Sequence, residues 1–116
     1  MSETLRQKQS RFARLVATKL IPQALAMGYE ITFGDAYRDP RLHGAMGAKK
    51  GYGATNSCHK LRLAIDLNLF KGGKFLQTSE DHKPLGEYWE SLGGTWGGRF
   101  SNPDGNHYSL EHNGFK

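Results

Sequence analysis

The stretch SCHKLRLAIDLNLF, residues 57–70, contains the clearest strand pattern in the chain. From Leu61 onward apolar and polar side chains alternate, which predicts a half-buried β-strand with Asp66 on its polar face. His59 has the opposite parity to Asp66, so an unbroken strand would send its imidazole to the core. The two side chains can meet only if the chain turns between His59 and Leu61. Such a turn is compatible with the sequence, because regular alternation begins only after Lys60.

The segments on either side of this strand predict further regular elements. Residues 3–27 repeat apolar side chains at three- and four-residue steps, which predicts one kinked helix or two helices, with the interruption at Pro22 and the end at Gly28. Residues 29–38 alternate with period two and predict a second strand with one packed face. The sequence KGGK at 71–74 predicts a tight hairpin turn.

The remaining chain predicts a loop, a helix and two short strands. Residues 39–57 are rich in glycine and lack periodicity, so we expect a long loop there. The segment SEDHKPLGEYWESLGG predicts a helix with Ser79 or Asp81 as N-cap and Gly93 as its stop. The segments TWGGRF and NHYSLEH predict strands separated by the turn SNPDG. This order predicts an α+β fold, with the N-terminal helix packed on a small, mainly antiparallel sheet.

Composition limits the class of protein. A chain of 116 residues, 37% of them hydrophobic, predicts a single domain over residues 1–116. Apolar runs stay far short of the roughly 18 residues that a membrane span needs, and the first residues lack the apolar core of a secretory signal. We therefore expect a cytoplasmic product without membrane insertion.

The single cysteine, Cys58, excludes an intramolecular disulfide. We expect it to be a small buried apolar residue rather than a ligand or nucleophile. The net charge of +5 favours polyanionic surroundings, either nucleic acid or an anionic cell wall.

The histidines and acids suggest a catalytic metal site. A catalytic zinc ion needs three protein ligands with nitrogen or oxygen donors and an open position for water. His59 and Asp66 offer two ligands, and His107 at the start of the last strand offers a third. Asp104, three residues earlier on a turn, could approach the water without binding the metal. Glu111 competes for the role of base, but four residues of strand at about 3.3 Å each place it about 13 Å from His107.

The stretch SCHKLRLAID resembles the S-x-H-x-x-G-x-A-x-D signature of the M15 zinc peptidases. This group comprises D-Ala-D-Ala carboxypeptidases and L-alanyl-D-glutamate endopeptidases, and it includes phage endolysins. The match lies at Ser57, His59, Ala64 and Asp66, whereas Arg62 stands where the signature has glycine. The later segments GGTWGGRF and DGNH resemble the group's W-G-G segment and its acid-x-x-His, and GDAYR resembles its arginine segment.

The resemblance implies the α+β fold shared by DD-peptidases and the zinc-containing domain of hedgehog proteins. It implies Zn²⁺ bound by His59, Asp66 and His107, with Asp104 as general base and Arg38 near the substrate carbonyl or carboxylate. It further implies a monomeric, bacteriolytic phage endolysin that remains in the host cytoplasm until it reaches the cell wall or periplasm. The expected partner is a peptidoglycan stem peptide, cut at the L-Ala–D-Glu bond, with D-Ala-D-Ala carboxypeptidase activity as the alternative.

Two interpretations come from other classes. A metal-dependent nuclease would use the same basic surface, and the sequence EHNG at 111–114 is faintly similar to such sites. A non-catalytic, zinc-stabilised wall-binding domain would need the three ligands alone. The presence of both Asp104 and Arg38 favours the peptidase, since a structural zinc ion needs neither, and the peptidase interpretation predicts no nucleic-acid partner.

Overall fold

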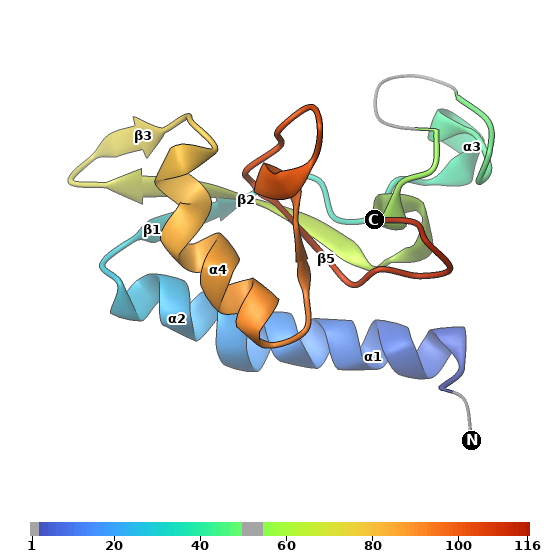
Figure 1. Ribbon diagram of the computed structural model, residues 1–116, viewed down its shortest axis with the longest axis horizontal. Helices are drawn as coiled ribbons and strands as arrows, with labels where there is room; N and C mark the ends of the chain where they lie inside the picture. The colour runs from blue at the N-terminus through green and yellow to red at the C-terminus, as the bar shows by residue number, and fades with distance from the viewer. Residues whose placement is uncertain (1–2, 50–54) are drawn as a thin grey trace.

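The computed structural model describes residues 3–49 and 55–116 and has an α+β architecture (Figure 1). A long N-terminal helical segment runs beneath an antiparallel sheet, and helix α4, Lys83–Ser91, packs beside the sheet. The predicted fold class is therefore confirmed. In the described part of the chain, no helix is both long and apolar enough to cross a membrane.

The N-terminal helical segment is continuous and contains one wide turn. Helix α1, Leu5–Leu15, leads through a π-helical turn, Val16–Leu20, into helix α2, Ile21–Ala26. A capping box at Thr4 satisfies the first backbone N–H groups. Pro22 lies two residues after the end of the wide turn, and because proline has no N–H to donate, a locally altered hydrogen-bond ladder is expected there. The segment is thus one helix with an irregular middle.

The sheet is built around the central strand β2, Ala64–Lys71. Strand order is β1-β2-β5-β4, with β3 also paired to β2, and every pairing is antiparallel. The flanking strands are β1 (Glu30–Phe33), β3 (Lys74–Leu76), β4 (Thr95–Trp96) and β5 (His107–Ser109). Gly72 and Gly73 both have positive φ, 58° and 78°, as the predicted hairpin turn between β2 and β3 requires.

Three expectations from the sequence need correction. Strand β2 begins at Ala64 rather than Leu61, because the preceding residues form a helical turn. The predicted loop contains a short helix, α3 (Pro40–His43), where Asp39 caps the first turn and proline supplies a preset φ. The second strand does not pack along one whole face, since Phe33, at the end of an edge strand, remains 66% exposed. The part of the loop prediction that falls on residues 50–54 lies outside the described residues.

Helix α4 differs in detail from the prediction. It follows a 3-10 turn, Glu80–His82, and Gly93 with φ 91° marks its end. Ser79 occupies the N-cap position of the 3-10 turn but makes no capping hydrogen bond with its side chain, and His82 is the N-cap of α4 itself. Asp81 exchanges side-chain hydrogen bonds with Thr78 across the turn, and Ser79 accepts a hydrogen bond from the backbone N–H of Gly105 instead.

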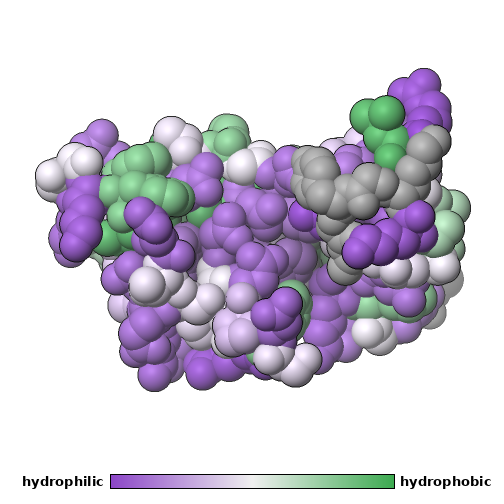
Figure 2. All heavy atoms as spheres, turned by 90° about the horizontal axis from the view of Figure 1, so that it is seen from above, coloured by the Kyte–Doolittle hydropathy of each residue, from purple (hydrophilic) through white to green (hydrophobic). Residues whose placement is uncertain are grey.

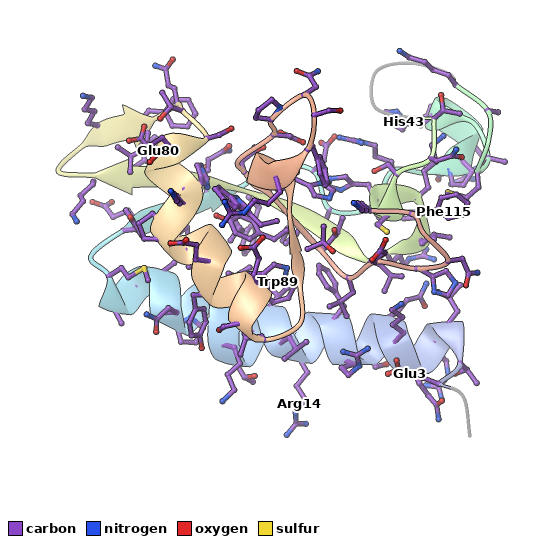
Figure 3. The ribbon with its side chains drawn as sticks, in the orientation of Figure 1. Glu3, Arg14, His43, Glu80, Trp89 and Phe115 are labelled. Carbon is purple, nitrogen blue, oxygen red and sulfur yellow. The ribbon has the colours of Figure 1, made fainter. Side chains whose placement is uncertain are left out.

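The core joins the helical segment, the sheet and α4. Trp89 of α4 is completely buried and meets Phe12 of α1 edge to face, with 5.9 Å between ring centroids. Its indole N–H donates to the carbonyl of Ser109 in β5. In Figure 3 Trp89 lies between α4 and the helical segment, whereas Arg14 of α1 points away from the protein. This core supports the inner strands from one side and leaves the opposite side of the sheet for polar side chains.

Candidate metal centre

Asp66 and His107 are brought together by strand register. They are direct partners in the antiparallel pairing of β2 with β5. Residues directly opposite in such a pair project on the same face, with Cβ atoms about 4.5–5.5 Å apart. His107 Nδ1 lies 3.8 Å from Asp66 Oδ1. A carboxylate and an imidazole that are far apart in sequence therefore lie side by side, because the two strands pair in this register.

His59 reaches the same position from a 3-10 turn, Cys58–Leu61. Ser57 caps this turn by accepting the backbone N–H of His59 at 3.2 Å. The turn ends at Arg62, which has left-handed backbone angles, φ 58° and ψ 33°. Glycine adopts this conformation without strain, which explains why the M15 signature has glycine there. Arg62 keeps the same turn, and its guanidinium stacks over the Tyr37 ring at 3.9 Å.

The three side chains have the spacing of metal ligands. His59 Nε2 is 3.1 Å from Asp66 Oδ1 and 3.2 Å from His107 Nδ1. Ligand atoms about 2.0–2.2 Å from a tetrahedral zinc ion lie roughly 3.3–3.6 Å from one another. One ligand atom from each residue lies within 4.8 Å of the others. Two ring nitrogens and a carboxylate oxygen thus converge in a way that a cation would stabilise.

Protonation of the two histidines also suits metal binding. His59 Nδ1 is 2.8 Å from the carbonyl of Ala36, and because a carbonyl only accepts, Nδ1 must carry the proton. In the neutral ring, Nε2 then presents its electron pair to the site. Burial lowers the pKa of His107 to about 4. His107 is therefore a neutral imidazole at pH 7, and its Nε2 is buried without a hydrogen-bond partner among the described residues.

Arg38 lies against the carboxylate of the site. Its Nη2 is 3.9 Å from Asp66 Oδ2, its Nε donates to Asp35 at 3.2 Å, and Nη1 contacts Ser57 Oγ at 3.4 Å. The backbone N–H of Arg38 donates to the carbonyl of His59. This network fixes the guanidinium beside the ligands, at the wall of a cleft of about 890 Å³.

Asp104 lies in the same cleft on the loop between β4 and β5. Its side chain opens to the cleft, yet partial shielding from water and the nearby charge of Asp66 raise its pKa. The loop is held by Gly97: a Cβ there would lie 2.2 Å from the Asp104 carbonyl and 2.7 Å from His107 Cβ. The W-G-G segment is thus structural, because only glycine permits this close approach.

Other residues considered from the sequence have structural roles. Trp96 and Tyr108 are buried, and the Trp96 indole donates to the carbonyl of Gly105. Cys58 is fully buried, and burial raises its pKa to about 11, so it is neither a ligand nor a thiolate. Tyr52 lies outside the described residues. Asn113 and Gly114 form a tight turn, which accounts for the EHNG sequence without a nuclease site.

Sequence reasoning missed two contributors to the site. The carbonyl of Ala36 orients His59, but a backbone group in a strand extension leaves no signal in the sequence. Phe100 places its ring 5.2 Å from the His107 ring and lines the cleft. Its position two residues after the W-G-G segment was the available clue.

Comparison with known proteins gives one family. Residues 50–110 match the model of a peptidase M15 family described as D-alanyl-D-alanine carboxypeptidase. A search of curated proteins gives no match. The matched region covers more than half of the chain and includes His59, Asp66, Asp104 and His107. The chain therefore belongs to this M15 family of peptidases.

Proposed function

We propose that this protein is a zinc-dependent hydrolase that cuts peptide bonds in peptidoglycan stem peptides, with the L-Ala–D-Glu bond as its first target. The observation that supports this most directly is the convergence of His59, Asp66 and His107. Through His107 this group reaches a cleft that Arg38 and Asp104 also line. Three ligands of this kind leave one tetrahedral position open, as catalytic rather than structural zinc sites do.

The three ligands would hold Zn²⁺, which when bound lowers the pKa of a water molecule and polarises the carbonyl of the scissile bond. Asp104, with its raised pKa, would accept the proton of the attacking water and pass it to the leaving amine. Arg38 would donate hydrogen bonds to the charge that develops on the substrate carbonyl oxygen. Ser57 and Asp35 hold its guanidinium in place for this role.

The preference for an endopeptidase over a carboxypeptidase rests on two hollows that share lining residues. A second hollow of about 210 Å³ adjoins the first, and Pro103 and Asp104 line both. A substrate chain can therefore continue on both sides of Asp104, as an endopeptidase requires. D-Ala-D-Ala carboxypeptidase activity is the second candidate, favoured by the description of the matching family.

Digestion of purified peptidoglycan, followed by mass spectrometry of the released fragments, tests the proposal. We expect new amino termini at D-Glu, loss of release with a chelator, and recovery with zinc. Release of free D-Ala alone would instead establish the carboxypeptidase. Asp104→Asn should abolish release while zinc remains bound. Cleavage of plasmid DNA, or wall binding without any release by the zinc-loaded protein, would refute the peptidase.

The biological setting follows from the same proposal. We infer a bacteriolytic phage endolysin that acts on the cell wall after a period in the host cytoplasm. The net charge of +5 supports action on an anionic wall. Lysis of bacteria from outside by the purified protein, and retention of the protein in the cytoplasmic fraction of an expressing host, are the matching measurements.

A further inference from the structure

The second hollow beside Asp104 differs in character from the main cleft. Basic residues Arg38, Arg99 and Lys116 line the main cleft. In the second hollow the side chains are chiefly uncharged hydrogen-bonding groups, namely Asn68, Gln77, Thr78, Ser79 and Asn106. Among the described residues of this lining, Asp104 is the only Asp, Glu, Lys or Arg.

His82 does not add charge to the second hollow. It lines the hollow, but burial lowers its pKa to about 4, so its ring is neutral at pH 7. The hollow therefore selects against anionic ligands, because an anion would lose water without gaining a cationic partner among the described residues of this lining. Amide and hydroxyl side chains both donate and accept, which matches a ligand rich in hydroxyl or amide groups.

One lining residue of this hollow belongs to an aromatic pair. Phe75 of β3 lines the hollow and is 43% exposed, and its ring lies 5.2 Å from that of Phe70 in β2. Viewed from above in Figure 2, apolar surface gathers at the end of the molecule that carries the β2–β3 hairpin, beside a broad hydrophilic centre. An apolar ring surface beside neutral hydrogen-bonding groups suits a sugar ring, which has one face of C–H groups and a polar rim.

We propose that this hollow, with Phe75 and Asn68 as its principal contacts, binds an uncharged N-acetylated amino sugar on the non-carboxylate side of the substrate. The inference rests on the proposed function and deepens it. In a stem peptide the sugar precedes L-Ala, whereas the carboxylates follow from D-Glu onward. A substrate that crosses Asp104 would then place its acidic part near Arg38 and Arg99 and its sugar in the second hollow.

Titration with N,N′,N″-triacetylchitotriose, followed by backbone NMR, tests the sugar site without any hydrolysis. We expect shifts at the amides of Asn68, Gln77 and Thr78. Phe75→Ala and Asn68→Ala should each weaken binding about fivefold or more. Phe33→Ala removes an exposed aromatic residue of β1, outside the hollow, and should leave the affinity unchanged.

The outcomes separate this inference from the proposed peptidase. Absence of shifts, shifts confined to other surfaces, or equal affinity in all variants would overturn the sugar site even if the protein cuts stem peptides. In hydrolysis assays, Phe75→Ala should raise KM for a sugar-bearing stem peptide several-fold more than KM for the same peptide without sugar. Equal changes in both KM values would contradict the assignment, and failure to cut either peptide would count against the peptidase instead.

Discussion

Replacing His82 with glutamine should remove a pH-dependent part of the folding stability. His82 is 2% exposed, and its Nδ1 lies 2.8 Å from the hydroxyl of Tyr108. Burial raises the pKa of Tyr108, so the phenol stays protonated and can donate to the neutral imidazole. Protonation of His82 would place a charge in this buried position and remove the acceptor.

The size of the effect follows from the change in pKa. The pKa of His82 falls from 6.5 to about 4 on folding, so the unfolded chain binds the proton more tightly. The contribution of the neutral His82 to the free energy of unfolding is therefore fully present above pH 6.5 and is lost as the pH falls toward 4. At about 1.36 kcal/mol per pKa unit, the native protein should lose about 3 kcal/mol of unfolding free energy from this group between pH 7 and pH 4.

Urea denaturation of both proteins in chelator, at pH values from 7 to 4, measures this contribution. The chelator removes metal from both samples, and other titrating groups largely cancel in the difference between them. Glutamine keeps an oxygen that can accept from Tyr108 but does not titrate. The native protein should lose about 3 kcal/mol more than His82→Gln across this range. A constant difference between the two proteins would refute a buried neutral histidine.

Three further substitutions test local features of the fold, each by urea denaturation. Arg62→Gly should be about 1 kcal/mol more stable than Arg62→Ala, because both variants lose the stacking on Tyr37 but only alanine is strained in the left-handed conformation. Equal stabilities of the two variants would contradict this backbone geometry. Gly86→Ala should destabilise by about 3 kcal/mol, since its Cβ would lie 2.2 Å from the Trp96 ring, and a neutral effect would exclude this packing. Lys60→Met should lower the free energy of unfolding by about 2 kcal/mol, because the buried ammonium donates to three backbone carbonyls. An unchanged denaturation midpoint would show that these hydrogen bonds contribute nothing.

Much of the candidate site could be predicted from the sequence, because the alternation of side chains along a strand decides which residues face the site. Asp66 stands on the polar face of an alternating strand, and His107 begins a second strand that pairs with it. The turn that brings His59 over Asp66 was required by the parity conflict between them, and the structure contains such a turn. Asp104 and Arg38 line the cleft, while their roles in catalysis remain predictions.

The details that sequence could not supply arise from tertiary contacts. Alternation at Leu61 predicted a longer strand, but a left-handed Arg62 separates this residue from β2. Phe33 fits a packed strand face by pattern, yet whether a side chain is covered depends on the helices beneath the sheet. The carbonyl that orients His59 belongs to Ala36, and any residue at that position would provide it.

Calorimetric titration of zinc into chelator-treated protein tests the central claim most directly. The native protein should bind one zinc ion tightly, and His107→Ala should lose this binding. His112→Ala removes a histidine that lies outside the group of three ligands and should bind as the native protein does. Circular dichroism of each variant would verify that it is folded. Absence of tight binding to the native protein, or undiminished binding to a folded His107→Ala, would contradict a zinc centre formed by His59, Asp66 and His107.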